Sequence, residues 1–265
     1  MNDRPRILSL GSTSVDARIA LAPNRTQWEE MDDPRSSVSE GNAAVWTMIR
    51  DEIDALYHPQ AKMLGSGSLV REDAPLRELP PVEGDIRSLY QDFLPEEVVK
   101  NPGHTTWLVV VDSRGRLRSG YKGTETPGHH MLHLVSWTTP PETLAFLQVQ
   151  RIPYLVSGED RVDLREAMTK MTAKLGVTCL VSEAVGRLNG ALLREGLIDE
   201  VDLILRPELI GGETTPMLFQ SPNLSPDAWP DRLRLLEVRP LESGFVWLRY
   251  EVLQSGSARE DLRPD

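Results

Sequence analysis

The chain has 265 residues, of which 40% are hydrophobic and 26% are charged, as in ordinary globular proteins. Its formal net charge of −11 argues against nucleic acid or an anionic membrane as a partner. The single cysteine, Cys179, lies in an apolar run and reads as a core residue in a reducing compartment. There is no signal-peptide pattern and no run of 18 uncharged apolar residues, so we expect a soluble, cytoplasmic protein.

Apolar periodicity predicts strands that alternate with helices. In chain order these are a strand at 7–10, a helix at 43–57, strands at 61–64, 107–111 and 133–136, a helix at 141–150, a strand at 153–156, a helix at 164–175 and a strand at 177–181. A short helix then ends before Gly196, which suits a left-handed cap, and a strand follows at 201–206.

The last part of the chain has a different pattern. Two strands, 232–239 and 245–253, are predicted to form an antiparallel hairpin that turns near Glu242-Ser243-Gly244. The predicted fold class is therefore α/β, with a mixed, mostly parallel sheet, helices on both faces and a C-terminal antiparallel hairpin.

One stretch, 77–103, is long and irregular, with several prolines and acidic residues. The strands on either side of it are typical of a single sheet, so we interpret it as a surface excursion within one domain spanning 1–254. The polar tail, 255–265, is predicted to be disordered.

The turn after the strand at 177–181 is the most informative segment. It reads Ser182-Glu183-Ala184-Val185-Gly186 and leads directly into the short helix. Backbone N–H groups at a helix start, together with the positive end of the helix dipole, favour an anion. This turn is therefore a candidate phosphate site, although Glu183 could instead cap the helix or pair with an arginine.

Several segments of the sequence resemble those of one protein family. The run Leu188-Asn189-Gly190-Ala191-Leu192-Leu193-Arg194-Glu195-Gly196-Leu197-Ile198-Asp199-Glu200-Val201, followed by Arg206-Pro207-Glu208-Leu209-Ile210-Gly211-Gly212, resembles the pyrimidine reductases of riboflavin biosynthesis, which have a dihydrofolate reductase-like fold. Three further segments are similar to that family: Ser14-Val15-Asp16-Ala17-Arg18, Gly65-Ser66-Gly67-Ser68-Leu69-Val70 and Asp73-Ala74-Pro75-Leu76. The resemblance covers about 6–253, least well at 77–103, and no deaminase domain is present in this sequence.

The resemblance implies an NADPH-dependent reductase similar to 5-amino-6-(5-phosphoribosylamino)uracil reductase. The hydride would pass to the sugar of a phosphorylated ribosylamino-pyrimidine, without a metal, in a homodimer formed through a sheet edge or the hairpin. Such catalysis is mostly placement, because the cofactor carries the hard chemistry. By position, the resemblance implies substrate contacts at Glu183, Thr26 and Leu76. It implies cofactor contacts at Ser12, Trp28, Ser68, Asp73, Ser136, Val185, Gly186, Arg187, Leu188, Asn189 and Gly190.

Two departures keep alternatives open. The family has glycines where this chain has Ala184-Val185, and another where it has Ala17. Glycine allows positive φ and close approach of a ligand to the backbone. The chain could therefore be a nucleotide- or pterin-binding protein that has lost hydride transfer, or a related reductase of another pathway.

Other features point to structural roles. The imidazoles of His129-His130-Met131-Leu132-His133 lack the glutamate of a zinc helix and precede a predicted strand, so no metal site is expected. The Asp199-Glu200 pair lies in a helix-to-strand turn, and we expect a structural or interface role for it.

Overall fold

A computed structural model describes residues 3–26, 29–30, 33, 35, 41–118 and 128–253. The predicted disordered tail lies outside these residues. The chain divides into two compact units, one made of Met1–Pro5 with His58–Leu180 and the other of Arg6–Tyr57 with Val181–Asp265. Because the two units are not placed relative to each other, the single domain expected over 1–254 stays a prediction.

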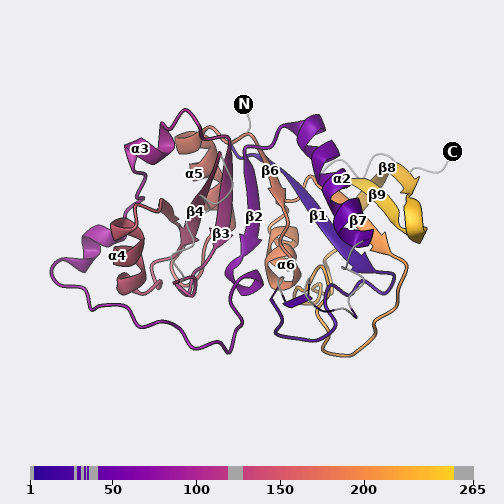
Figure 1. Cartoon of the computed structure of the whole chain (residues 1–265), viewed down its shortest axis with the longest axis horizontal. Helices are drawn as coiled ribbons and strands as arrows, with labels where there is room; N and C mark the ends of the chain where they lie inside the picture. Colours follow the sequence, from indigo (N-terminus) through magenta and orange to yellow (C-terminus); the bar gives the residue numbers. More distant parts are fainter. Residues whose placement is uncertain are drawn as a thin grey trace. The chain divides into compact units, whose positions relative to one another are not determined.

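The unit containing His58–Leu180 is built on a parallel sheet. Its strands lie in the order β5-β4-β3-β2, and each neighbouring pair is parallel. The elements are β2 (Ala61–Gly65), η1 (Ser66–Ser68), η2 (Ile86–Leu89), α3 (Glu96–Val99), β3 (Thr106–Val111), β4 (His129–Val135), α4 (Pro141–Val149), β5 (Tyr154–Val156) and α5 (Leu164–Leu175). Figure 1 labels β2, β3, β4, α3, α4 and α5 among them. All the carboxyl ends of parallel strands lie at one edge, which is where α/β sheets bind ligands.

Local sequence explains where the helices of this unit begin and end. Pro141 occupies the first position of α4, where its missing N–H costs nothing. Asp163 caps α5 by accepting the N–H of Glu166, and Gly176 ends it with φ +67°. A buried hydrophobic cluster that includes Val110 of β3, Met131 of β4 and Leu144 of α4 packs these elements together.

The other unit joins a parallel strand pair to the antiparallel hairpin. The strand β1 pairs in parallel with β7, and β9 pairs antiparallel with both β7 and β8. The elements are β1 (Arg6–Ser14), α2 (Gly41–Tyr57), α6 (Gly186–Arg194), β7 (Glu200–Arg206), β8 (Arg232–Pro240), η3 (Glu242–Gly244) and β9 (Val246–Leu253). The division between the two units falls after Leu180, within β6 (Cys179–Ser182).

A buried charge network fastens α2 to this sheet. Glu200 and Asp202 of β7 are fully buried. The Arg249 guanidinium of β9 donates to Glu200 at 2.7 Å, to Asp202 at 3.1 Å and to the hydroxyl of Tyr57 at the end of α2. Burial, followed by the charge of Glu200, raises the pKa of Asp202 to about 7. The second carboxylate oxygen of Asp202 has no hydrogen-bond partner among the described residues.

The predicted fold class is confirmed, and many element boundaries differ from the predicted ones by one to four residues, as three strands illustrate. The first strand continues to Ser14 rather than ending at Leu10. The strand predicted at 133–136 begins at His129, because the carbonyl of Gly128 already accepts the N–H of Thr106. The strand predicted to begin at Val177 begins at Cys179, since the N–H of Val177 closes the end of α5 on Met171.

The irregular stretch 77–103 contains the short elements η2 and α3. Its Phe93 exchanges both backbone hydrogen bonds with Tyr154 of β5, each 2.9 Å long. The excursion is therefore anchored to the sheet edge at Phe93.

The expected structural role of Asp199-Glu200 is also seen. Asp199 accepts the backbone N–H of Ile7 at 2.8 Å, and Glu200 belongs to the buried network. No helix among the described residues has both the length and the apolar composition needed to cross a membrane.

Candidate functional site

Glu183 follows β6 directly, and its carboxylate is held by an arginine from a distant part of the sequence. The Nε atom of Arg50 on α2 lies 3.5 Å from the Oε1 atom of Glu183, whose side chain is 15% exposed. This oxygen is buried and accepts no hydrogen bond from the described residues. Glu183 does not cap α6, whose N-cap residue is Val185. Of the two structural roles weighed from sequence, arginine pairing is therefore the one observed, and one carboxylate oxygen keeps unused hydrogen-bonding capacity.

The start of α6 is built without the glycines of the related reductases. Val185 is extended, with φ −136° and ψ 166°, a conformation that a β-branched residue adopts readily. The positive φ of the turn, +58°, falls on Gly186, and a Cβ placed there would meet nothing closer than 3.5 Å. The side chain of Val185 makes no cap hydrogen bond to the helix start. Gly186 itself is buried, and its carbonyl accepts the backbone N–H of Gln220 at 3.0 Å.

Two other residues of the predicted cofactor loop, Asn189 and Gly190, make contacts inside the protein. Asn189 is buried and exchanges hydrogen bonds with the hydroxyl of Ser9 on β1. A Cβ on Gly190 would lie 2.1 Å from the backbone oxygen of Gln220, so only glycine allows that segment to cross α6. The predicted cofactor residues therefore divide: Arg187 is exposed, whereas Gly186, Asn189 and Gly190 are buried.

Ser12 and the turn after β1 lie against the end of β7. Asp16 accepts hydrogen bonds from Ser14 and from the backbone N–H groups of Ile210 and Gly211, and these bonds, that of Ser14 foremost, lower its pKa to about 2. The guanidinium of the buried Arg206 donates to the carbonyl of Ser12 at 3.1 Å. The backbone of Ser12 is thus tied to Arg206, while its side chain is half-buried.

Ala17 occupies the position where the related reductases have glycine, and it keeps the backbone conformation that glycine favours. Its φ is +63°. The turn is closed by a hydrogen bond from its N–H to the carbonyl of Ser14. The turn therefore holds a residue with a Cβ in the left-handed region, which costs energy.

Thr26 is engaged in a capping box. Its hydroxyl accepts the backbone N–H of Glu29, and the Glu29 carboxylate accepts the backbone N–H of Thr26 at 2.7 Å. Trp28 lies outside the described residues.

The remaining predicted residues belong to the unit containing His58–Leu180. Ser68 ends η1, directly after the carboxyl end of β2. Asp73 is exposed and pairs with Arg71 at 3.0 Å, and Leu76 is half-buried. Ser136 is fully buried at the carboxyl end of β4, and its N–H donates to the Thr139 hydroxyl. Ser68 and Ser136 thus both follow the carboxyl ends of parallel strands, β2 and β4.

The histidine run lies within β4 instead of before it, because the strand begins at His129. Alternation along the strand separates its imidazoles. His133 is fully buried, and burial lowers its pKa to about 4, whereas His130 stacks edge-on against His104 with ring centroids 4.7 Å apart. Among the described residues, no group of three or more histidine, cysteine or acidic side chains could hold a metal ion.

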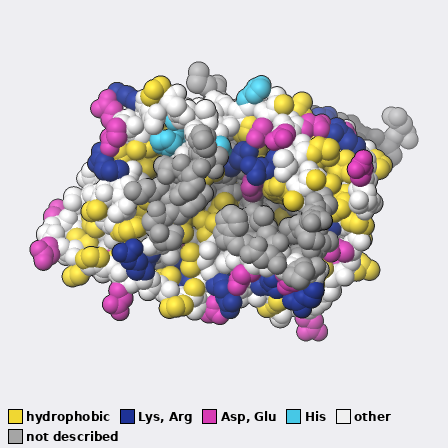
Figure 2. Space-filling model, in the orientation of Figure 1, with side chains coloured by type: hydrophobic (Ala, Val, Ile, Leu, Met, Phe, Trp, Pro, Cys, Tyr) yellow, Lys and Arg dark blue, Asp and Glu magenta, His cyan; other side chains and the backbone are white. Residues whose placement is uncertain are grey.

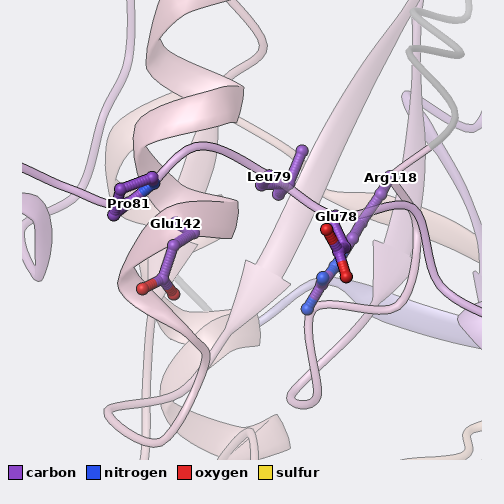
Figure 3. Close-up of a pocket in the computed structure, with 5 residues that line it drawn as sticks. All are labelled: Glu78, Leu79, Pro81, Arg118 and Glu142. Atoms are coloured by element: carbon purple, nitrogen blue, oxygen red, sulfur yellow. The ribbon is translucent and has the colours of Figure 1, made fainter.

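A pocket in the same unit is lined by Glu78, Leu79, Pro81, Arg118 and Glu142 (Figure 3). Leu79 and Pro81 come from the irregular excursion and Glu142 from α4. None of the site residues predicted from the sequence lines it.

Sequence reasoning missed Arg50, and it gave Arg206 no role beyond its place in a run that resembles the family. Both act through partners more than a hundred positions away in the sequence, Glu183 and Ser12 respectively. An arginine in an amphipathic helix and one at a strand end are ordinary features, so no local signal singles them out.

The chain matches the family described as "RibD C-terminal domain" over residues 5–247. It is 26% identical over 232 residues to the 2,5-diamino-6-ribosylamino-4(3H)-pyrimidinone 5′-phosphate reductase of Methanothermobacter thermautotrophicus, covering 88% of this chain and 90% of that protein. It is 24% identical over 234 residues to the riboflavin biosynthesis protein RibD of Escherichia coli, covering 88% of this chain and 56% of that protein.

Among solved structures, that of RibD from Acinetobacter baumannii is similar, with a TM-score of 0.60 and 21% identity over 96% of this chain and 59% of that chain. The chain thus spans little more than half of each RibD protein and nearly all of the archaeal reductase. The match over 5–247 covers both units and confirms the resemblance identified from the sequence. The chain belongs to the RibD C-terminal domain family.

Proposed function

We propose that the chain is an NADPH-dependent reductase that transfers a hydride to the sugar carbon of a phosphorylated ribosylamino-pyrimidine. Family membership and the archaeal relative named for such a reduction support this chemistry. The observation that carries the proposal is Glu183, a carboxylate at the end of β6, paired with Arg50 and with a buried oxygen that accepts no hydrogen bond from the described residues.

In this proposal, Glu183 accepts hydrogen bonds from N–H groups of the pyrimidine. Arg50 fixes its carboxylate before the substrate arrives. A preoriented acceptor reduces the entropy cost of placing the substrate, which is the main need of a reaction whose hydride comes from a cofactor. NADPH supplies the hydride when it is bound.

The helix start at Gly186 fits a phosphate of that cofactor. The first turn of α6 has no side-chain cap hydrogen bond, so its backbone N–H groups keep capacity for an anion, although Gly186 itself is buried. Arg187 adds an exposed positive charge at the same place. Ser68 and Ser136, at the ligand-binding edge of the other unit, are proposed as further cofactor contacts.

The test is a two-part assay of the whole chain. Calorimetry with NADPH and NADH measures cofactor binding, and loss of absorbance at 340 nm on adding the ribosylamino-pyrimidine phosphate measures turnover. We expect tighter binding of NADPH, and turnover that falls at least tenfold in Glu183→Gln with little change in NADPH affinity. The matched control is Glu195→Gln, an exposed glutamate at the other end of α6. Absence of NADPH binding up to millimolar concentration would instead favour the binding-protein alternative, and binding without turnover of this substrate would favour a related reductase.

We also propose that the enzyme is a homodimer joined through β8. This strand ends the sheet order, and it exposes Leu233, Leu235, Leu236 and Val238. Figure 2 shows hydrophobic side chains gathered at the right of the view, where the hairpin lies. An exposed apolar edge strand is a template for pairing with another chain. We expect the partner at β8 to be a second copy of this chain. We also expect the protein to lie in the cytoplasm, because its single cysteine cannot form an internal disulfide.

Light scattering tests this assembly. The wild type is expected at twice the mass of one chain, and Leu235→Glu at the mass of one. Leu224→Glu, which changes an exposed leucine outside the strand, is the control. A monomeric wild type would refute the homodimer without affecting the proposed reaction.

A further inference from the structure

A stacked pair of aromatic rings lies at the ligand-binding edge of the parallel sheet. Trp137 lies two positions after Val135, the last residue of β4, and it is 55% exposed. Its ring stacks on that of Tyr90, with centroids 5.3 Å apart and planes 12° from parallel. One face of the indole is thus supported from within the unit, and much of the remaining ring surface is open.

The backbone of this turn is fixed from both sides. The N–H of Trp137 donates to the carbonyl of Gly158 at 3.1 Å, which ties it to the segment after β5. The Thr139 hydroxyl donates to the carbonyl of Ser113 at 2.9 Å, which ties it to the segment after β3. Trp137 is therefore held by the carboxyl ends of both neighbouring strands.

Tyr90 is fixed as well. Its hydroxyl donates to the carbonyl of Thr139 at 2.8 Å, and its ring packs against the core cluster of the unit. Burial raises the pKa of Tyr90, so it remains a neutral donor. A large ring that is rigid before binding loses little entropy when a ligand stacks on it.

We propose that Trp137, supported by Tyr90, is a stacking platform for a planar heteroaromatic base, the adenine of the dinucleotide cofactor. This rests on the proposed function, which places a nicotinamide dinucleotide on the chain. Three features carry the inference: a sheet edge of the kind that binds nucleotides, an exposed indole, and a fixed ring behind it. A supported aromatic face takes any base by stacking, and alanine substitution at such platforms weakens binding by about 5- to 150-fold.

The experiment measures binding of ADP, UMP and NADPH to the wild type, Trp137→Ala, Trp137→Phe and Trp229→Ala. Trp229→Ala is the matched control, because Trp229 is 80% exposed and lies in the other unit. We expect Trp137→Ala to weaken ADP and NADPH binding at least fivefold, and Trp137→Phe, which keeps an aromatic face, to stay within about threefold of the wild type. The control is expected to bind like the wild type.

Tryptophan fluorescence and kinetics give independent readouts. ADP is expected to quench part of the wild-type emission, and this part is lost in Trp137→Phe. In turnover assays, Trp137→Ala is expected to raise the KM for NADPH more than it lowers kcat. Equal ADP affinity in the wild type and Trp137→Ala would overturn the proposed platform. If the wild type still binds NADPH in that case, the proposed function is not affected. Dependence of UMP rather than ADP binding on Trp137 would overturn the adenine assignment, and a wild type that binds no dinucleotide would overturn both proposals.

Discussion

Ala17→Gly is expected to stabilise the protein, opposite to the usual effect of this substitution. Ala17 has a φ of +63°, in the left-handed region, and its N–H closes the turn onto Ser14. This conformation costs a residue with a Cβ roughly 1–2 kcal/mol. Glycine removes that cost but loses about 0.5–1 kcal/mol more backbone entropy on folding. The net expectation is a gain of roughly 0.5–1 kcal/mol in the free energy of unfolding, or about 1–4 °C in Tm.

Urea denaturation followed by circular dichroism measures this gain. The matched control is Ala55→Gly, an exposed alanine within α2 of the same unit. There the same change is expected to destabilise by about 0.5–1 kcal/mol, because the alanine is already helical. The signature is therefore opposite signs for two identical substitutions. If Ala17→Gly leaves the free energy of unfolding unchanged or lowers it, the strain assigned to this turn is wrong.

Three further outcomes follow from contacts described above. Gly190→Ala is expected to lower the free energy of unfolding by about 1–3 kcal/mol, although alanine normally favours a helix, because the new Cβ would lie 2.1 Å from the backbone oxygen of Gln220. The control is Gly67→Ala, which has open space around it and is expected to be near neutral in the same denaturation assay. Since burial raises the pKa of Asp202 to about 7, the folded state binds more protons than the unfolded state between about pH 4 and 7. The stability of the wild type relative to Asp202→Asn should therefore fall as pH rises through this window, by at most about 1.4 kcal/mol per pH unit, and a difference that is flat with pH would contradict the buried position. Asp16→Asn is expected to speed hydrogen exchange at the amides of Ile210 and Gly211, which donate to Asp16, and to leave the amide of Asp199 protected as an internal control.

The hydrophobic pattern predicted the fold class because strands and helices alternate with short connections. It located α5 at Leu164–Leu175 to the residue, since Asp163 and Gly176 mark its ends chemically. It misplaced the start of β4, because His129 and His130 are polar residues whose strand pairing depends on Thr106 and Trp107, 23 positions earlier. Strand ends of this kind are decided by hydrogen bonds to neighbours that a single segment does not reveal.

The candidate site was predictable only in part. Glu183 and Gly186 follow from their place between a strand and a helix. The contact of Gly190 with Gln220 and the pairing of Arg50 with Glu183 depend on the three-dimensional path of segments far apart in the sequence. The positive φ of Ala17 was not predictable from the sequence, because a residue with a Cβ adopts the left-handed conformation only at an energetic cost.

The helix α2 joins two parts of its unit that are distant in sequence. Arg50 pairs with Glu183, and two positions later Glu52 binds the guanidinium of Arg239 on β8. At the end of the helix, Tyr57 is fixed by Arg249 on β9. Substitutions in the hairpin can therefore shift α2 and, through Arg50, change the position of the Glu183 carboxylate. We expect hairpin residues and residues near Glu183 to covary when sequences of this family are compared.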